Sequence, residues 1–269
     1  MRAMKVIAAL ALVVMLAAAL GGCLYINVGD GKAVTGSGKI ESKEVALERA
    51  LTGIRDMGSI DVIIDSSLDG KAVIEGDDNL IEYVELSQNG DGVLTVDYDD
   101  GLNIMFVRQM RVYVPALDGG SIETMGSGDI SMTGGTLTGG SFDIRTGGSG
   151  DISLSLEADD VRLSVNGSGD MDMAVKAAVL EVESRGSGDI GISGTAQRIG
   201  VSISGSGELE AAGLEAQDAD VNLSGSGDAY VTVTGSLTGS VSGSGDLEYS
   251  GDPAGVDVSE NGSGSIRKR

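Results

Sequence analysis

Seven carboxylates recur from residue 129 onward, each directly after a Gly-Ser-Gly triplet. The members of this acidic column are Asp129, Asp151, Asp170, Asp189, Glu208, Asp228 and Asp246. If the segments that carry them stack, neighbouring carboxylates come close together, and carboxylate oxygens are ligands that Ca²⁺ prefers. Asp151, Asp170 and Asp189 are therefore candidate metal ligands. The alternative, which we favour, is that each carboxylate caps the backbone of its own turn. In that case the protein binds no metal and needs no cofactor.

Paired carboxylates can also act as general acid and base in the cleavage of polysaccharides. Such a pair needs a defined separation, a cleft and one carboxyl group with a raised pKa. Here the acids follow a turn motif that recurs many times, and only 3% of the residues are aromatic, so few side chains can stack on sugars. The chain has no His, which excludes a Ser-His-Asp arrangement. We therefore expect no catalytic residue and no enzymatic activity. A polysaccharide lyase or hydrolase is the alternative.

The Gly-Ser-Gly triplet that precedes each acid is the strongest repeat in the sequence. It begins at Gly36, Gly126, Gly148, Gly167, Gly186, Gly205, Gly225, Gly243 and Gly262. From Gly126 onward successive triplets are 18 to 22 residues apart, and 19 is the commonest step. A fixed period of this length predicts an array of stacked structural repeats.

Apolar and polar residues alternate on both sides of each triplet. In one repeat, Ile152 and Leu154 alternate with serine, and Val161, Leu163 and Val165 alternate with arginine and serine. Alternation with a period of two indicates a strand with one buried face. Each repeat is thus expected to contain a strand, a loop, a second strand and a tight turn. We expect glycine at the turn because glycine tolerates positive φ angles.

Nineteen residues are too few for a strand–helix–strand unit with its loops. They suffice for one coil of a parallel β-solenoid, in which every strand pairs with its equivalent in the next coil. The predicted fold is therefore all-β: a single-domain, parallel, right-handed β-solenoid, or β-helix, with coils of about 19 residues. The three extra residues of the first coil fall in "TGGTLTGG", between its two strands, so both strands are expected to keep their register.

The N-terminus has the features of an export signal. Two basic residues precede an apolar run over residues 6–20, which is short for a membrane-spanning helix. The ending "LGGC" resembles a prokaryotic lipobox. This resemblance implies a signal peptide that is cleaved before Cys23, and a lipid, with acyl chains such as palmitate, attached to the Cys23 thiol. We expect an exported lipoprotein that is anchored to a prokaryotic cell membrane and faces outside the cytoplasm. An uncleaved anchor helix is the alternative.

Four segments follow from these patterns. Residues 1–22 form the signal peptide and residues 23–35 a tether from the lipid. Residues 36–125 form a less regular β N-terminal part that caps the solenoid, and residues 126–269 form the regular repeat. A cap is expected because a bare terminal coil exposes an unpaired strand edge.

The charge balance limits the partners that the protein can bind. The chain has 18 Lys and Arg against 41 Asp and Glu, and two of the basic residues lie in the signal peptide. Such an acidic surface repels phosphate backbones and anionic lipid head groups. We therefore expect no nucleic acid partner, and attachment to the membrane only through the N-terminal lipid.

The tetrads "GSGDI" and "GSGDM", together with "GSIDVII" and "RVYVPAL", resemble the head GIN domain family of autotransporter adhesins. The resemblance covers roughly residues 34–266. It implies an envelope protein in which an irregular β N-terminal portion precedes the repeated coils, and it implies no agreed catalytic residues.

The expected function is that of a cell-envelope lipoprotein, adhesin-like, that binds or scaffolds without catalysis. Parallel rows of polar side chains could make many weak contacts with a glycan or a surface protein. Besides the polysaccharide-active enzyme, a structural or regulatory component of the envelope stress response is an alternative.

Overall fold

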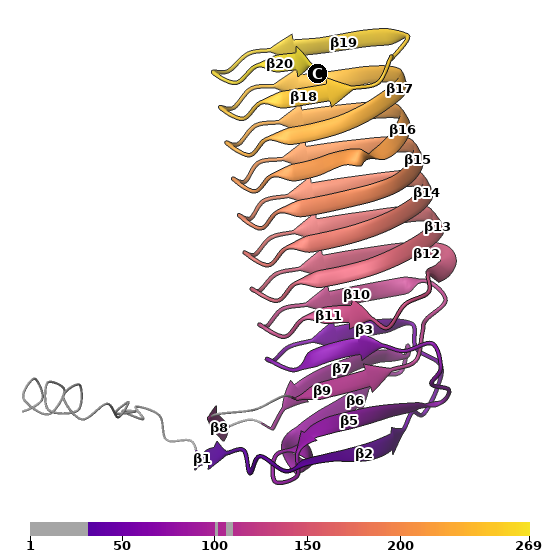
Figure 1. Cartoon of the computed structure of the whole chain (residues 1–269), viewed down its shortest axis with the longest axis vertical. Coiled ribbons are helices and arrows are strands. Elements are labelled where there is room, and N and C mark those ends of the chain that lie inside the picture. Colours follow the sequence, from indigo (N-terminus) through magenta and orange to yellow (C-terminus); the bar gives the residue numbers. More distant parts are fainter. Residues whose placement is uncertain (1–31, 100–101, 106–109) are drawn as a thin grey trace, which may run out of the picture.

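The computed structural model describes residues 32–99, 102–105 and 110–269. Within these ranges every regular element is a β-strand except one 3₁₀ turn, η1 (Ile81–Tyr83). The strands stack into an elongated body of about eight turns (Figure 1). The predicted all-β class is confirmed.

Five long strands build the regular part of the stack, and each supplies both sides of one coil. They are β13 (Ile152–Val165), β14 (Met171–Ser184), β15 (Ile190–Ile203), β16 (Leu209–Leu223) and β17 (Ala229–Val241). Each pairs in parallel with the next, so that Ile152 lies beside Met171 and Met171 beside Ile190. This register confirms the predicted parallel β-solenoid with coils of about 19 residues.

The loop that we expected between the two strands of a coil is missing from these five coils, because one strand continues through the bend. In the first coil a true loop separates β11 (Ile130–Met132) from β12 (Leu137–Thr146), where the three extra residues lie and two glycines have positive φ. Ile130 still pairs with Ile152, and Leu137 with Leu156. Both sides of the first coil therefore keep their register, as predicted.

The core fills the narrow space between the two sides of each coil. Inward side chains such as Leu163, Leu180 and Ile199 have no exposed surface, and Met171 and Met173 are buried with them. Burying each such side chain contributes about 1.5–3 kcal/mol. Because equivalent positions repeat from coil to coil, the core forms continuous rows of aliphatic side chains.

The glycines of the repeated tetrads do not serve the purpose that we expected. From Gly126 onward, none of these glycines has a positive φ angle in the described structure. Instead, a Cβ atom at Gly167 would lie 2.0 Å from the carbonyl oxygen of Gly148. The coils come this close because the Ser168 N–H donates to that oxygen, at 2.9 Å between nitrogen and oxygen. Close packing of successive corners therefore requires glycine.

Near the N-terminus, the order of coils in space departs from the order in the sequence. The strands β3 (Gly53–Asp56) and β4 (Asp61–Ile64) form a coil that pairs on one side with β10 (Gly120–Thr124) and β11. On its other side it pairs with β7 (Val93–Tyr98) and β9 (Arg111–Val114). The chain thus leaves the stack after β4, builds the outer coil, and returns at β10.

Antiparallel strands close this end of the stack (Figure 1). The strand β5 (Lys71–Asp77) pairs with β2 (Ile40–Ala46) and β9, and β6 (Val84–Gln88) pairs with β7. A separate two-stranded sheet joins β1 (Lys32–Thr35) to β8 (Leu102–Met105).

The opposite end is formed by β18 (Leu247–Ser250), β19 (Gly255–Glu260) and β20 (Ile266–Lys268). No helix that is long and apolar enough to span a membrane occurs in the described ranges.

Candidate functional site

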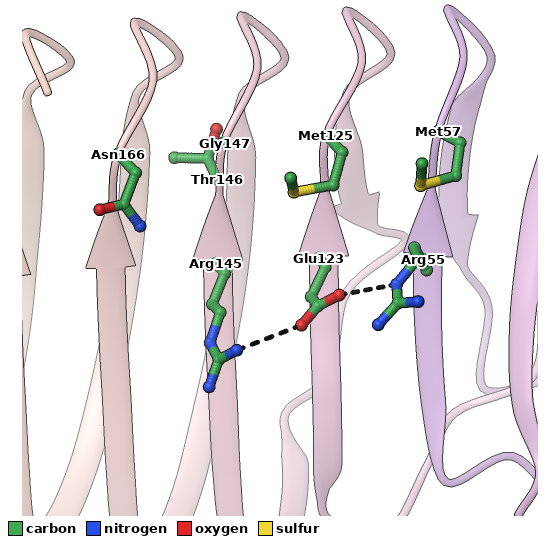
Figure 2. A pocket seen from close by; sticks show the side chains of 8 residues that line it. All are labelled: Arg55, Met57, Glu123, Met125, Arg145, Thr146, Gly147 and Asn166. Atoms are coloured by element: carbon green, nitrogen blue, oxygen red, sulfur yellow. Dashed lines mark hydrogen bonds and ion pairs between the residues drawn. The ribbon is translucent and has the colours of Figure 1, made fainter.

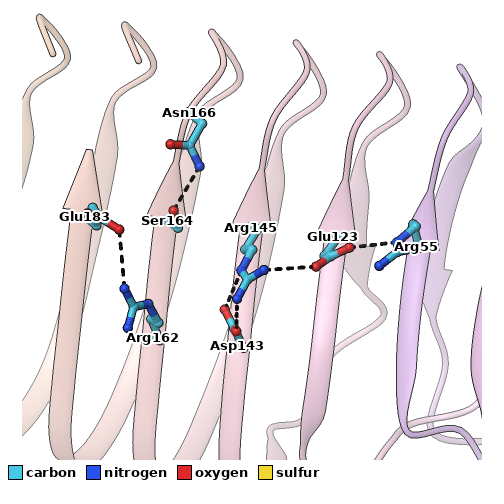
Figure 3. A network of polar contacts seen from close by, with 8 residues as sticks. All are labelled: Arg55, Glu123, Asp143, Arg145, Arg162, Ser164, Asn166 and Glu183. Carbon is cyan, nitrogen blue, oxygen red and sulfur yellow. Dashed lines mark hydrogen bonds and ion pairs between the residues drawn. The ribbon is translucent and has the colours of Figure 1, made fainter. Parts of the chain in front are cut away.

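One outer face of the solenoid gathers arginines from neighbouring coils (Figure 3). It is built by β3, β10, β12, β13 and β14, and we call it the arginine face. Its charged members are Arg55, Glu123, Asp143, Arg145, Arg162, Glu183 and Arg185. Since β3, β10 and β12 pair in register, Arg55, Glu123 and Arg145 lie side by side in successive coils.

Ion pairs hold two of these arginines in place. The Arg55 Nε lies 2.7 Å from Glu123 Oε2, and an Arg145 terminal nitrogen lies 3.6 Å from the other oxygen of Glu123. Arg145 also forms a bidentate contact with Asp143. This contact, together with the negative charge of Glu123, raises the pKa of the Arg145 guanidinium. Exposed pairs add little stability, so their main effect here is to orient the guanidinium groups.

A second group of contacts extends the face toward β14. Arg162 lies 3.4 Å from a carboxylate oxygen of Glu183, and Arg185 pairs with the other oxygen. Two further acids, Asp160 and Glu181, lie beside Arg162 on this face. Its four arginines therefore stand against five acids and the face is nearly balanced in charge, whereas the whole chain has a net charge of −23. An anionic partner therefore meets less repulsion on this face than on the acidic remainder.

A hollow of about 450 Å³ opens on the arginine face beside the tetrad corners (Figure 2). Its lining residues are Arg55, Met57, Glu123, Met125, Arg145, Thr146, Gly147 and Asn166. The methionines are 44% and 49% exposed, which is high for large apolar side chains. A second hollow, of about 500 Å³, lies on the same face and is lined in part by Ser121, Asp143 and Arg162.

The acidic column does stack, but its carboxylates serve a neighbouring coil rather than their own turn. Asp151 Oδ1 accepts a hydrogen bond from the Asp170 N–H, at 2.8 Å between oxygen and nitrogen, and Asp170 Oδ1 accepts one from the Asp189 N–H at 2.7 Å. The expectation of a cap within each turn is therefore wrong for these residues: because the corners stack closely, each carboxylate accepts the N–H of the next coil.

The three candidate metal ligands Asp151, Asp170 and Asp189 thus lie in successive coils. In the part of the chain that the structure describes, no group of three or more acidic, His or Cys side chains is arranged to hold a metal ion. At Glu208, burial raises the pKa of the carboxyl group, and the charges of Asp189 and Asp228 add to the effect.

One buried carboxyl group was not anticipated from the sequence. Asp56 has no exposed surface, and burial raises its pKa to about 7. Its Oδ1 accepts a hydrogen bond from the Gly58 N–H at 3.2 Å, and its Oδ2 lies 3.2 Å from Thr124 Oγ1. Because the side chain is enclosed, a substrate has no access to it, and its role is structural.

The sequence contains a signal that would have revealed both Asp56 and the arginine face. The segment Gly58-Ser-Ile-Asp61 occupies the position of a tetrad, and Gly126 packs on the Gly58 carbonyl. Aligning the two tetrads places Arg55 beside Glu123, and Met57 beside Met125.

The predicted lipid-attachment residue Cys23 and the predicted signal peptide, residues 1–22, lie outside the described residues.

Several solved structures share this fold. A "putative adhesin" from Parabacteroides distasonis is 26% identical, with a TM-score of 0.79, over 88% of this chain and 100% of its own. A protein of the same species named "putative lipid binding protein" is 25% identical, with a TM-score of 0.76, over the same shares. A "putative adhesin" from Parabacteroides merdae, 24% identical with a TM-score of 0.70, covers 87% of this chain and 99% of its own and supports the fold alone. A search of curated proteins gave no match.

The sequence itself matches a family profile over residues 50–253, well over half of the chain. The family is described as "Putative auto-transporter adhesin, head GIN domain", and the match includes the arginine face and the repeated tetrads up to β18. The chain belongs to this head GIN domain family.

Proposed function

We propose that this protein is an exported lipoprotein of the cell envelope that binds surface partners in the manner of an adhesin. In this proposal, Cys23 carries the lipid and attaches the solenoid to a prokaryotic membrane, facing outside the cytoplasm. The "LGGC" sequence supports the anchor, and membership of an adhesin family supports the binding role.

The observation that carries the proposal is the arginine face. Its charged side chains are fixed by ion pairs and repeat at the coil spacing of about 4.8 Å. A rigid, periodic surface suits a partner that is itself repetitive or extended, such as an acidic glycan or a surface protein, because many weak contacts then add up. No cofactor takes part.

A polysaccharide lyase or hydrolase remains the alternative function, and the geometry favours it less. The acids of the column already accept backbone N–H groups from the next coil. Asp56, whose pKa burial raises to about 7, is enclosed. A structural or regulatory role in the envelope stress response is a further alternative, which partners recovered from the native membrane would identify.

Binding of the purified protein to arrays of acidic and neutral glycans and to purified cell-surface proteins tests the proposal. We expect saturable binding that is weakened at least tenfold in the double variant Arg162→Gln/Arg185→Gln, which removes two charge-assisted contacts. The matched control is Arg267→Gln, at the far end of the solenoid. Release of new reducing ends or unsaturated sugars, without stable binding, would contradict it. Separately, Cys23→Ser should move the protein from the membrane to the soluble fraction.

A further inference from the structure

The hollow beside the tetrad corners has an apolar floor. In the described part of the chain, four large apolar side chains are strongly exposed, and two of them, Met57 and Met125, lie in this hollow. They follow Arg55 and Glu123 by two residues in paired strands, so they come from adjacent coils (Figure 2). Exposed methionines are unusual unless something covers them, and their flexible thioethers adapt to varied apolar ligands.

Space for a ligand arises because the next coil has glycine at the equivalent position. Gly147 follows Arg145 as Met125 follows Glu123, and it has no side chain to fill the surface. The Met125 thioether leans toward this gap: a Cβ atom at Gly147 would lie 2.8 Å from the Met125 sulfur. The two thioethers and the bare glycine backbone together make a shallow apolar trough.

Hydrogen-bond donors border this trough. Among the described residues, Arg55 uses only its Nε in the ion pair with Glu123, and its two terminal nitrogens have no partner there, so they can donate to an anion. Arg145, in contrast, is held by both Asp143 and Glu123. The planar fork of a guanidinium group matches a carboxylate, and such charge-assisted hydrogen bonds are among the stronger ones.

We propose that this hollow binds a single-chain amphiphile with a carboxylate head, of the fatty-acid type. The acyl chain covers Met57 and Met125, and the carboxylate pairs with the terminal nitrogens of Arg55. A sugar acid fits less well, because no aromatic ring lines the hollow to stack on a sugar ring. The proposal is independent of the adhesive role, which is tested at Arg162 and Arg185.

Fluorescence titration of the purified protein with cis-parinarate, a conjugated fatty acid, tests the proposal, with its methyl ester as the uncharged comparison. We expect saturable binding of the acid that weakens about tenfold in Arg55→Gln, the loss of one charge-assisted contact. Binding of the ester should be the same in that variant and in the wild type. The double variant Met57→Gln/Met125→Gln should weaken the binding of both probes.

Two control variants lie outside the hollow: Arg198→Gln, an exposed arginine, and Val256→Thr, an exposed apolar residue of β19. Both should bind the acid as the wild type does. Absence of saturable binding would overturn the proposal, as would binding that the methionine variants leave unchanged. If Arg55→Gln weakened acid and ester equally, the carboxylate would not be held by Arg55. Thermal melting of each variant separates these outcomes from loss of folding.

Discussion

The Asp151 carboxylate accepts a hydrogen bond from the backbone N–H of Asp170, nineteen residues later, at 2.8 Å between Oδ1 and nitrogen. The same bond joins Asp129 to Asp151 and Asp189 to Glu208. At six of the seven positions of the acidic column, the fourth residue of the tetrad thus links its coil to the next at the corner. This link gives the recurring acid a structural role that does not require a metal ion.

Replacing Asp170 tests this link. Asp170→Ala removes the acceptor of the Asp189 N–H, and we expect the melting temperature to fall by about 2–4 °C, as for the loss of one hydrogen bond in a protein of this size. Asp170→Asn keeps an oxygen acceptor and removes a charge from an acidic row, so its melting temperature should match or exceed that of the wild type. If both variants lost the same stability, the hydrogen bond would not be the cause.

The corner glycines give a second prediction. Gly167→Ala forces a Cβ atom to within 2.0 Å of the Gly148 carbonyl oxygen, and backbone must move to relieve the clash. We expect the free energy of unfolding to fall by about 2–3 kcal/mol or more, measured by urea denaturation. Gly140→Ala is the matched control, because a Cβ atom there has no neighbour within 4 Å. A small effect at Gly167 would refute close packing of the corners.

The third prediction concerns pH. Burial raises the folded-state pKa of Asp56 from 3.8 to about 7, with the charges of Asp97 and Asp61 adding to the effect. The folded protein therefore holds this proton more tightly than the unfolded chain. The resulting stabilisation is fully present below about pH 4 and is lost as the pH rises to about 7.

Asp56→Asn removes this titration and keeps the contacts. The amide oxygen can accept the Gly58 N–H, and the amide nitrogen can donate to Thr124 Oγ1, which in turn lies 3.0 Å from the Gly128 carbonyl oxygen. We measure the free energy of unfolding by urea denaturation. We expect its value for the variant, relative to the wild type, to increase by a few kcal/mol at most as the pH rises from 4 to 8. A difference that does not change with pH would contradict the raised pKa.

The fourth prediction is that Ca²⁺ does not stabilise the protein. One oxygen of Asp151 and one of Asp170 are already occupied by N–H donors, which leaves few ligands for a cation that takes six to eight oxygens. Millimolar Ca²⁺ should leave the melting temperature within about 1 °C of the value in a chelator, since only binding to the folded state raises it. A melting temperature that rises with Ca²⁺ concentration and then saturates would contradict this prediction and support a metal site at Asp151, Asp170 and Asp189.

The sequence predicted the stacked coils because their signal is local and repeated. Ile152, Met171 and Ile190 each follow a tetrad by the same interval, so their pairing can be read directly. The pairing of Arg55 with Glu123 spans 68 residues, because the strands from β5 to β9 intervene, and no period connects the two. The arginine face and its hollow were therefore not predicted, because the one sequence signal for them is the degenerate tetrad Gly58-Ser-Ile-Asp61, which lacks the second glycine.

Two physical details were also beyond the sequence. A glycine can be required either by a positive φ angle or by close packing against a neighbouring backbone. The sequence alone does not show which of these two reasons requires glycine at position 167. The Asp151 carboxylate could accept a backbone N–H either from its own turn or from the neighbouring coil. The sequence does not give the distance between coils, which decides which of the two N–H groups it accepts. The burial of Asp56, in contrast, could have been predicted, because Asp56 occupies the next inward position after Ile54 in the alternating pattern of β3.

Disulfide cross-linking of Glu157→Cys/Lys176→Cys, in a Cys23→Ser background, tests the stacked solenoid most directly. Glu157 and Lys176 pair in register in adjacent coils, about 4.8 Å apart, which suits a disulfide. Glu157→Cys/Thr195→Cys spans two coils, at about 9.6 Å, which is too far. We expect efficient oxidation of the first pair and none of the second; cross-linking of the second pair, or of neither, would refute the stacked solenoid.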